Sequence, residues 1–254
     1  AFEKQYPGQV VVSQVDFLRV ATVWPCSSFP EAYFALGKLP SVYKTLYEAE
    51  TGSKTWRTTR THQMLWYLNR QTVLAHLTDL LESGVDLIVS VHPLVHHLVV
   101  NGFDEIFGDT PGRPPVVTVV TDLGSAHLSW FDPKVDGLFV PSEAIRRLAV
   151  LHEVPAPTIH LCGLPLREAF WRGTADSDAR QDKLHLGMAS ESRVVLLMGG
   201  GEGFGNLYEV AVAIAAVLSR NPLGQLVVVC GRNKAVKDYL DEYPWAELGG
   251  SQGR

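Results

Sequence analysis

The sequence predicts an α/β protein built on parallel, doubly wound sheets, and three observations carry that prediction. Short apolar runs alternate with longer stretches in which apolar residues recur at helical spacing. Glycines, prolines and capping residues separate the two kinds of segment. Residues 194–206 pass from an apolar run through a glycine cluster directly into a helical pattern, as a buried strand, a tight turn and a helix would.

The composition is that of a globular protein with ample material for a core. The 254 residues are 46% hydrophobic and 19% charged, and the net charge of −5 gives no electrostatic case for binding nucleic acid. The three cysteines lie far apart, so no disulfide framework or thiolate metal cluster is predicted. No apolar run approaches the roughly 18 residues that a membrane-spanning helix needs.

The first 168 residues are predicted to form one α/β domain. Strands are expected at 9–16, 85–91, 115–122, 137–141 and 158–163. Helices are expected over 62–81, from His92-Pro93 onward, and over 143–152, where Ser142 provides the cap.

A second domain is predicted to begin at about residue 178. The stretch 163–167 breaks the alternation, and the polar residues that follow form the boundary. A short helix over 178–186 and two strands, the second at 225–230, then start a second domain that stops early, so 178–254 is an incomplete unit. Because the chain also begins at Ala1, we expect a fragment or an incomplete gene product.

The glycine cluster at 199–205 is a candidate anion site, because free N–H groups at a helix start favour negative charge. Simple tight packing is the alternative. The loop lacks the Lys-Ser/Thr pair of a P-loop, which argues against NTP hydrolysis. No acidic residue follows the strand at 225–230, which argues against NAD, although Arg232 leaves NADP open.

Other polar candidates follow the ends of predicted strands. Asp122 and His127 share one such loop and could perform acid–base chemistry, or simply cap the loop and sit at the surface. Trp130 and Phe131 are expected to be exposed beside them. Arg167, near the domain boundary, could reach a diphosphate with its guanidinium fork, or make a surface salt bridge.

Three histidines at positions 92, 96 and 97 have the spacing of a metal site. His92 precedes a proline, which disfavours helical geometry there, and no carboxylate or thiolate completes the set nearby. We therefore predict no metal site, and expect His92 to line a cleft at the end of its strand.

Residues 17–47 mix aromatic residues with prolines, including Trp24-Pro25, and are predicted to be irregular. Aromatic rings of this kind suit a membrane interface, and Lys54, Arg57 and Arg60 could meet anionic headgroups. The alternative, that the rings are core and the charges solvated, is equally open.

Six motifs resemble, in order and spacing, those of monogalactosyldiacylglycerol synthases of glycosyltransferase family 28. They are SVHPLVHH (90–97), VVTDLGSAHLSWFDP (119–133), FVPSE (139–143), GLPLREAF (163–170), LLMGGGEGFG (196–205) and CGRNK (230–234). The resemblance implies a GT-B fold, in which two Rossmann-like domains face a cleft, and inverting transfer of galactose from UDP-galactose to 1,2-diacylglycerol.

The same resemblance implies roles for particular residues. Domain 1–168 would accept the lipid, and domain 178–254 would begin the nucleotide-sugar-binding part. The donor UDP would be bound by Arg167, Gly200, Gly201, Glu202, Gly203, Phe204, Arg232 and Asn233. The acceptor side would include Trp24, Pro25, His92 and Trp130, with Asp122 and His127 as tentative catalytic residues.

The resemblance also implies the setting of the enzyme. No cofactor or metal is expected at the donor, and anionic lipid is a candidate activator. The protein would lie peripherally on a plastid envelope or a bacterial plasma membrane; dimerisation is left open. The family's N-terminal glycine-rich loop with its histidine and its C-terminal Glu-Ala segment have no counterpart here, so we expect residues 1–254 alone to be inactive.

Alternative functions remain open at this point. The same scaffold could transfer glucose to diacylglycerol, or an amino sugar to an undecaprenyl lipid. An oxidoreductase is disfavoured by the missing acidic residue, and a non-catalytic truncated product is the remaining alternative.

Overall fold

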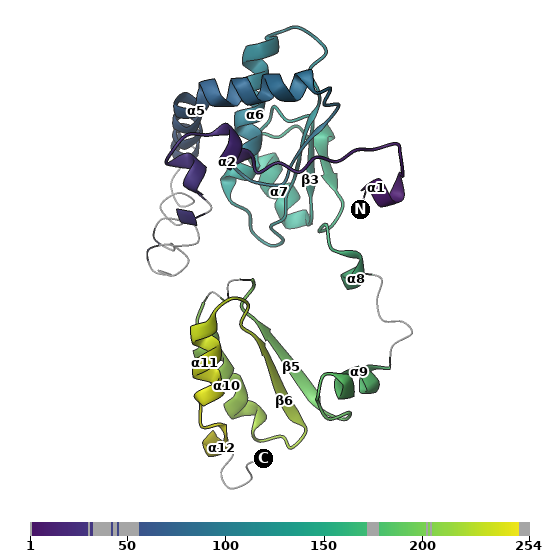
Figure 1. Cartoon of the computed structure of the whole chain (residues 1–254), viewed down its shortest axis with the longest axis vertical. Coiled ribbons are helices and arrows are strands. Elements are labelled where there is room, and N and C mark those ends of the chain that lie inside the picture. Colours follow the sequence, from purple (N-terminus) through teal and green to yellow (C-terminus); the bar gives the residue numbers. More distant parts are fainter. Residues whose placement is uncertain are drawn as a thin grey trace. The chain divides into compact units, whose positions relative to one another are not determined.

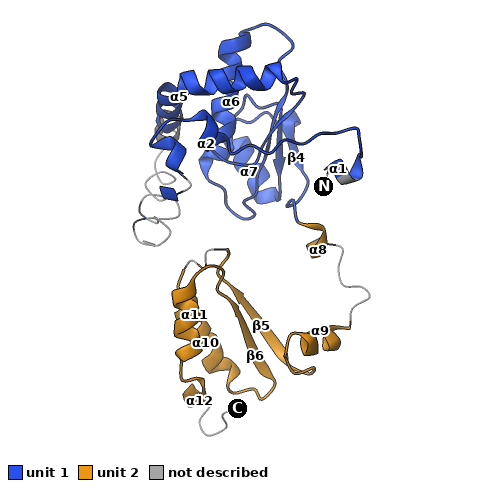
Figure 2. Cartoon of the chain, viewed as in Figure 1, with its two compact units in different colours: residues 1–166 blue, residues 167–254 orange. Residues whose placement is uncertain are grey.

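The computed structural model describes residues 2–29, 31–32, 42, 45, 56–171, 178–201, 203 and 205–248 (Figure 1). The chain divides into two units, residues 1–166 and residues 167–254 (Figure 2). Each unit combines parallel strands with helices, which confirms the predicted α/β class. The cleft between two facing domains stays a prediction.

The first unit contains a four-stranded parallel sheet in which spatial order follows chain order. Its strands are β1 (Ile88–Ser90), β2 (Val116–Val119), β3 (Gly137–Val140) and β4 (Ile159–Leu161). Parallel crossovers are right-handed, and crossovers that always advance in one direction place their helices on one face of the sheet. Alternate residues of β2 are accordingly buried and half-buried.

The longest helices of this unit are α5 (Trp56–Glu82), α6 (Val95–Phe107) and α7 (Glu143–Leu151). Helices α5 and α6 pack closely at Gly102, where an added Cβ would lie 2.3 Å from Leu77 Cδ1. The Ser142 hydroxyl accepts a hydrogen bond from the Ile145 N–H at 3.4 Å, so the predicted cap of α7 is confirmed.

Short elements complete the first unit. They are α1 (Phe2–Gln5), α2 (Phe17–Ala21), η1 (Cys26–Ser28), η2 (Leu128–Trp130) and η3 (Ala156–Thr158). The predicted strand at 9–16 is wrong, because residues 10–16 have no regular structure and are exposed. Their valines suit a strand, but no strand of the described residues pairs with them, and a strand without a partner leaves its backbone groups unpaired.

The second unit is built on a two-stranded parallel sheet of β5 (Arg193–Met198) and β6 (Gly224–Val229). Its helices are α8 (Glu168–Trp171), α9 (Ala179–His185), α10 (Leu207–Leu218), α11 (Lys234–Glu242) and α12 (Trp245–Leu248). Helix α10 contacts both strands, and Leu196 and Met198 of β5 remain exposed. No helix within the described residues has the length and apolar character needed to cross a membrane.

Candidate functional site

Two loops at the carboxyl ends of β5 and β6 are hydrogen-bonded to one another. The first, residues 199–206, leads into α10; the second, residues 230–233, leads into α11. The Arg232 N–H donates to the Gly201 carbonyl at 2.8 Å, and Asn233 Nδ2 donates to the Gly203 carbonyl at 3.0 Å. We call this pair of loops the paired-loop site.

Glycine is required at two positions where the loops touch. Gly203 has φ of +62°, and a Cβ added there would lie 2.1 Å from the Cys230 carbonyl oxygen. Gly231 has φ of +58°, and its added Cβ would lie 2.4 Å from the Gly201 carbonyl oxygen. Both contacts are far below van der Waals distance and involve backbone, so a side chain at either position would separate the loops.

The paired-loop site has the chemistry of an anion site. The backbone N–H groups that begin α10 follow the glycine loop directly, and the Asn206 side chain does not cap them. Such groups and the helix dipole favour a bound anion. Arg232 adds a cation on the adjoining loop, where its side chain is exposed.

The structure therefore brings together five of the predicted donor residues. They are Gly200, Gly201, Gly203, Arg232 and Asn233. Glu202 and Phe204, predicted for the same site, lie outside the described residues. Binding of a nucleotide by these residues stays a prediction.

Asn233 connects the loops in two ways, and these can be tested separately. Its Nδ2 donates to the Gly203 carbonyl, while its Oδ1 accepts from the Val236 N–H at 3.1 Å and caps α11. Asn233→Asp keeps the acceptor and loses the donor, whereas Asn233→Ala loses both. We expect Asp to retain the thermal stability of the second unit better than Ala, by about 1 kcal/mol, because a helix cap is worth about that much. Unfolding midpoints of both variants measure this, and equal midpoints would refute the cap.

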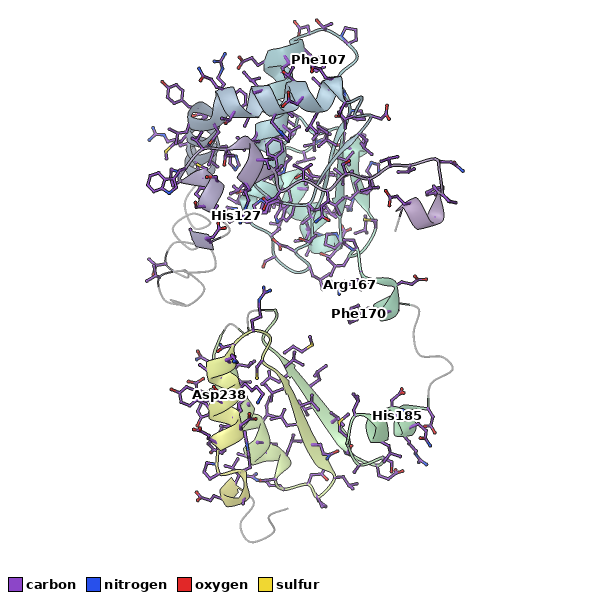
Figure 3. The ribbon with its side chains drawn as sticks, in the orientation of Figure 1. Phe107, His127, Arg167, Phe170, His185 and Asp238 are labelled. Atoms are coloured by element: carbon purple, nitrogen blue, oxygen red, sulfur yellow. The ribbon has the colours of Figure 1, made fainter. Side chains whose placement is uncertain are left out.

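Arg167 lies just before α8, exposed at the surface, and Phe170 is exposed in the same helix (Figure 3). The Arg167 carbonyl accepts from the Phe170 N–H at 2.9 Å, so the backbone of Arg167 is held at the start of this turn. Its predicted contact with a diphosphate stays a prediction.

In the first unit, Asp122 and His127 lie on the loop that follows β2. Asp122 Oδ2 accepts a hydrogen bond from the Trp130 indole N–H at 2.8 Å. His127 Nδ1 accepts from the Ser129 N–H at 3.2 Å and lies 2.5 Å from the Ser129 hydroxyl oxygen. Both side chains are half-buried, and their catalytic roles stay predictions.

The predicted exposure of Trp130 and Phe131 is wrong. Trp130 is 3% exposed and Phe131 is also buried, and both belong to the hydrophobic core. The helical turn η2 directs the indole inward, where Asp122 satisfies its N–H. Trp130 therefore does not offer a ring to a lipid surface.

The contact between Asp122 and Trp130 gives a test of the role of Asp122. We expect Asp122→Ala to destabilise the first unit by about 1–3 kcal/mol, because the buried indole N–H loses its acceptor. Asp122→Asn keeps an acceptor oxygen and removes the negative charge, so it should fold normally. Thermal unfolding measures the first effect. If Asp122→Asn folds normally but the full-length protein loses catalytic activity, Asp122 acts through its charge rather than through packing.

The predicted acceptor-side residues lie on different segments of the first unit. Trp24, three residues after the end of α2, is 80% exposed, and the peptide bond between Trp24 and Pro25 is cis. His92 lies between β1 and α6, where its Nδ1 accepts from the Leu94 N–H at 3.3 Å. Of the basic residues, Arg60 is exposed on α5, while Lys54 and the side chain of Arg57 lie outside what the structure describes.

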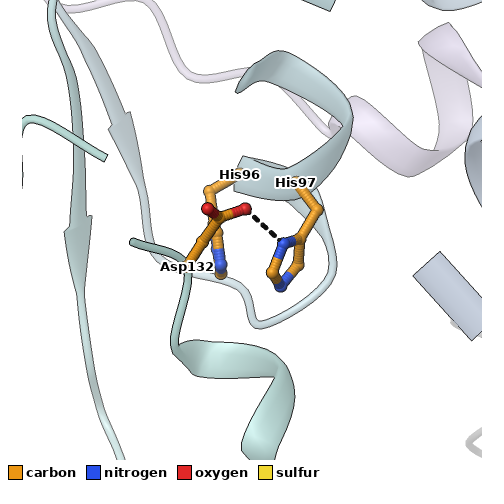
Figure 4. A group of neighbouring side chains, drawn as sticks. All are labelled: His96, His97 and Asp132. Carbon is orange, nitrogen blue, oxygen red and sulfur yellow. Dashed lines mark hydrogen bonds and ion pairs between the residues drawn. The ribbon is translucent and has the colours of Figure 1, made fainter. Parts of the chain in front are cut away.

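A buried polar cluster joins two of the histidines considered above, His96 and His97, to Asp132, which the sequence analysis did not single out. His96 and His97 of α6 project toward Asp132, and His97 Nδ1 lies 2.6 Å from Asp132 Oδ2 (Figure 4). Burial lowers the pKa of His96 well below its usual value. Burial alone would raise the pKa of Asp132, but the hydrogen bond and charge of His97 lower it to about 2. His96 and His97 follow β1 and Asp132 follows β2, and neighbouring parallel strands end at the same edge of a sheet. That topology was the one signal that could have predicted their contact.

Known proteins resemble this chain along most of its length. Residues 1–166 match the family model described as monogalactosyldiacylglycerol (MGDG) synthase. The chain is 31% identical over 251 residues to monogalactosyldiacylglycerol synthase 2, chloroplastic, of Arabidopsis thaliana, a match that covers 96% of this chain and 51% of that protein.

Two further relatives give the same result. The chain is 32% identical to a probable monogalactosyldiacylglycerol synthase 3, chloroplastic, of Oryza sativa subsp. japonica, with 87% of this chain and 43% of that protein covered. It is 29% identical to monogalactosyldiacylglycerol synthase, chloroplastic, of Spinacia oleracea, with 96% and 46% covered. The chain thus spans about half the length of the curated relatives it matches.

Proposed function

Because the chain belongs to the monogalactosyldiacylglycerol synthase family, we propose that it serves the transfer of galactose from UDP-galactose to 1,2-diacylglycerol. The product is monogalactosyldiacylglycerol, formed with inversion at the anomeric carbon. The observation that carries this proposal is the family match across residues 1–166, the whole of the first unit.

The second unit is the proposed donor side. The glycine-rich turn between β5 and α10 supports this, because its backbone amides and the helix dipole suit the diphosphate of UDP. Arg167, Arg232 and Asn233 are the proposed side-chain partners. These groups would stabilise UDP as it leaves, with no metal at the donor.

The first unit is the proposed acceptor side. A base removes the proton of the lipid hydroxyl, and the oxygen attacks the anomeric carbon from the face opposite UDP. The bond from that carbon to the diphosphate breaks, and UDP leaves with the electron pair. Asp122 and His127 are the proposed acid–base groups among the described residues, since they share the loop after β2.

We place the protein peripherally on a plastid membrane. Its relatives from Arabidopsis and rice are named chloroplastic. Exposed Trp24 supports surface contact with lipid, since an indole suits the interface between headgroups and water. Anionic lipid is the proposed activator, and a homodimer is compatible with this location.

The function is tested with purified full-length protein, UDP-galactose and vesicles that contain diacylglycerol. The expected product is a monogalactosyl lipid, identified by mass spectrometry, whose β-anomeric linkage is established by proton NMR. UDP-glucose in place of UDP-galactose serves as the comparison. A product from UDP-glucose alone, or binding of UDP without transfer to diacylglycerol, would overturn the proposal.

The role of Arg167 has its own expected outcome. Arg167→Ala in the full-length protein should weaken UDP binding about tenfold or more, because a charge-assisted hydrogen bond is worth about 1.5–3 kcal/mol. Calorimetric titration with UDP measures this. The matched control is Arg180→Ala, an exposed arginine of α9 that lies 3.2 Å from Glu191. Equal affinities for UDP in the two variants would remove Arg167 from the site.

A further inference from the structure

The buried cluster of the first unit has the geometry of a metal-binding site. His96, His97 and Asp132 each offer one ligand atom, and these atoms all lie within 4.8 Å of one another. The histidines come from α6 and the carboxylate from the segment after η2, 35 residues along the chain (Figure 4). This set supplies the carboxylate whose absence from the neighbouring sequence argued against a metal.

An independent observation points to a missing partner. His96 is 0% exposed, and neither of its ring nitrogens has a hydrogen-bond partner among the described residues. The His92 backbone lies near the His96 ring but forms no hydrogen bond of normal geometry with it. Buried polar atoms are almost always paired, with protein, water or an ion. His96 therefore has capacity for a ligand that the described residues do not supply.

His97 is oriented as metal-binding histidines usually are. Its Nε2 lies 2.8 Å from the Ser129 carbonyl oxygen, which can only accept, so Nε2 carries a hydrogen and donates it. The other nitrogen, Nδ1, is directed at Asp132. A histidine ligand characteristically donates its second ring N–H to a carbonyl or carboxylate, which fixes the ring. Without an ion, Nδ1 shares a hydrogen with Asp132 Oδ2 at 2.6 Å, and an ion that binds both atoms would displace that hydrogen.

We propose that His96, His97 and Asp132 bind one divalent ion of the zinc class inside the first unit. Two imidazole nitrogens and one carboxylate oxygen suit zinc and its neighbours, whereas magnesium and calcium prefer oxygen ligands. The ion would tie α6 to the segment that follows η2, and so hold the loop bearing Asp122 and His127. It is a structural site, separate from the metal-free donor chemistry proposed above.

His62 is the candidate for the fourth position. Its ring centroid lies 3.6 Å from that of His97, and its buried Nε2 has no partner among the described residues. A ring nitrogen without a partner among the described residues thus belongs to a ring that contacts the proposed ligand His97.

The first experiment measures metal content in full-length protein purified from zinc-supplemented cells. Elemental analysis should find one more zinc per chain in the unaltered protein than in His96→Gln or Asp132→Asn. The matched control is His185→Gln on α9, an exposed histidine of the other unit, which should retain all the zinc. Equal zinc content in all four proteins, or none in the unaltered one even after titration with zinc, would overturn the proposal and leave water as the occupant.

A second measurement does not depend on whether the variants fold. X-ray absorption of the zinc-loaded, unaltered protein should show nitrogen and oxygen neighbours at about 2.0–2.2 Å with the signature of imidazole. A shell at about 2.3 Å would indicate thiolate ligands instead, such as Cys26, Cys162 or Cys230, and would overturn the assignment. Removing zinc with a chelator should lower the unfolding midpoint of the first unit, and zinc but not magnesium should restore it.

Discussion

Gly203→Ala is expected to abolish measurable binding of UDP while the first unit stays folded. The new Cβ would lie 2.1 Å from the Cys230 carbonyl oxygen and 2.7 Å from Asn233 Cβ, at a backbone φ of +62°. The position of the Cβ is fixed by the backbone, so no side-chain rotation can relieve its clash with the carbonyl. The two loops of the paired-loop site must therefore separate. Overpacking and left-handed strain together should destabilise the second unit by about 3 kcal/mol or more.

A matched control separates the clash from the backbone strain. Gly187 also has positive φ, +74°, but a Cβ added there meets no atom within 4 Å. Gly187→Ala should therefore show the strain alone and bind UDP normally. Calorimetric titration measures UDP binding by both variants, and thermal unfolding measures the stability of their second unit. If Gly203→Ala bound UDP within threefold of the unaltered protein, the paired-loop site would not be the nucleotide site.

Gly102→Leu is expected to unfold or severely destabilise the first unit. Gly102 is buried in α6, and even a Cβ would lie 2.3 Å from Leu77 Cδ1 and 3.5 Å from Val73 Cγ1 of α5. A leucine side chain needs far more room than a methyl group, so α5 and α6 must move apart. We expect a loss of about 3 kcal/mol or more, at the upper end of overpacking effects.

Combining Gly102→Leu with Leu77→Ala tests directly whether the clash with Leu77 causes the loss of stability. Leu77 is fully buried, so Leu77→Ala alone should cost about 2–5 kcal/mol through the cavity it leaves. In the double variant the new leucine can occupy that cavity, and the two losses should sum to more than the loss observed. Denaturant unfolding of all four proteins gives the coupling. Additive losses would show that the two helices do not meet through this pair.

The sequence predicted the parallel strands and long helices well, because these elements carry continuous apolar runs or clear helical periodicity. Residues 85–91 and 137–141 contain β1 and β3, and residues 62–81 fall inside α5. A helix N-cap could also be predicted, because Ser142 lies immediately before a helical pattern. The predicted strand at 9–16 was wrong because a strand needs a neighbouring strand to pair with, and the local sequence does not show whether one is present.

The candidate sites were only partly predictable. The paired-loop site could be anticipated because a glycine cluster between a strand and a helix has few structural explanations. The hydrogen bond between Trp130 and Asp122 could not be anticipated. The surrounding loop residues suggested that the indole is exposed, whereas the 3₁₀ turn buries it. Asp132 joins His96 and His97 through the fold alone, because their distance in sequence hides their contact.

The order of the first sheet, in which spatial position follows chain position, also determines how its backbone amides should exchange with deuterium. Among the described strands, β2 and β3 have a partner on both sides, whereas β1 and β4 are edges. The chain leaves toward the second unit directly from β4, a three-residue strand whose His160 and Leu161 are exposed. Its edge position, short length and exposed residues make β4 the least protected strand of this sheet. Local opening should start at β4 and leave β2 and β3 protected.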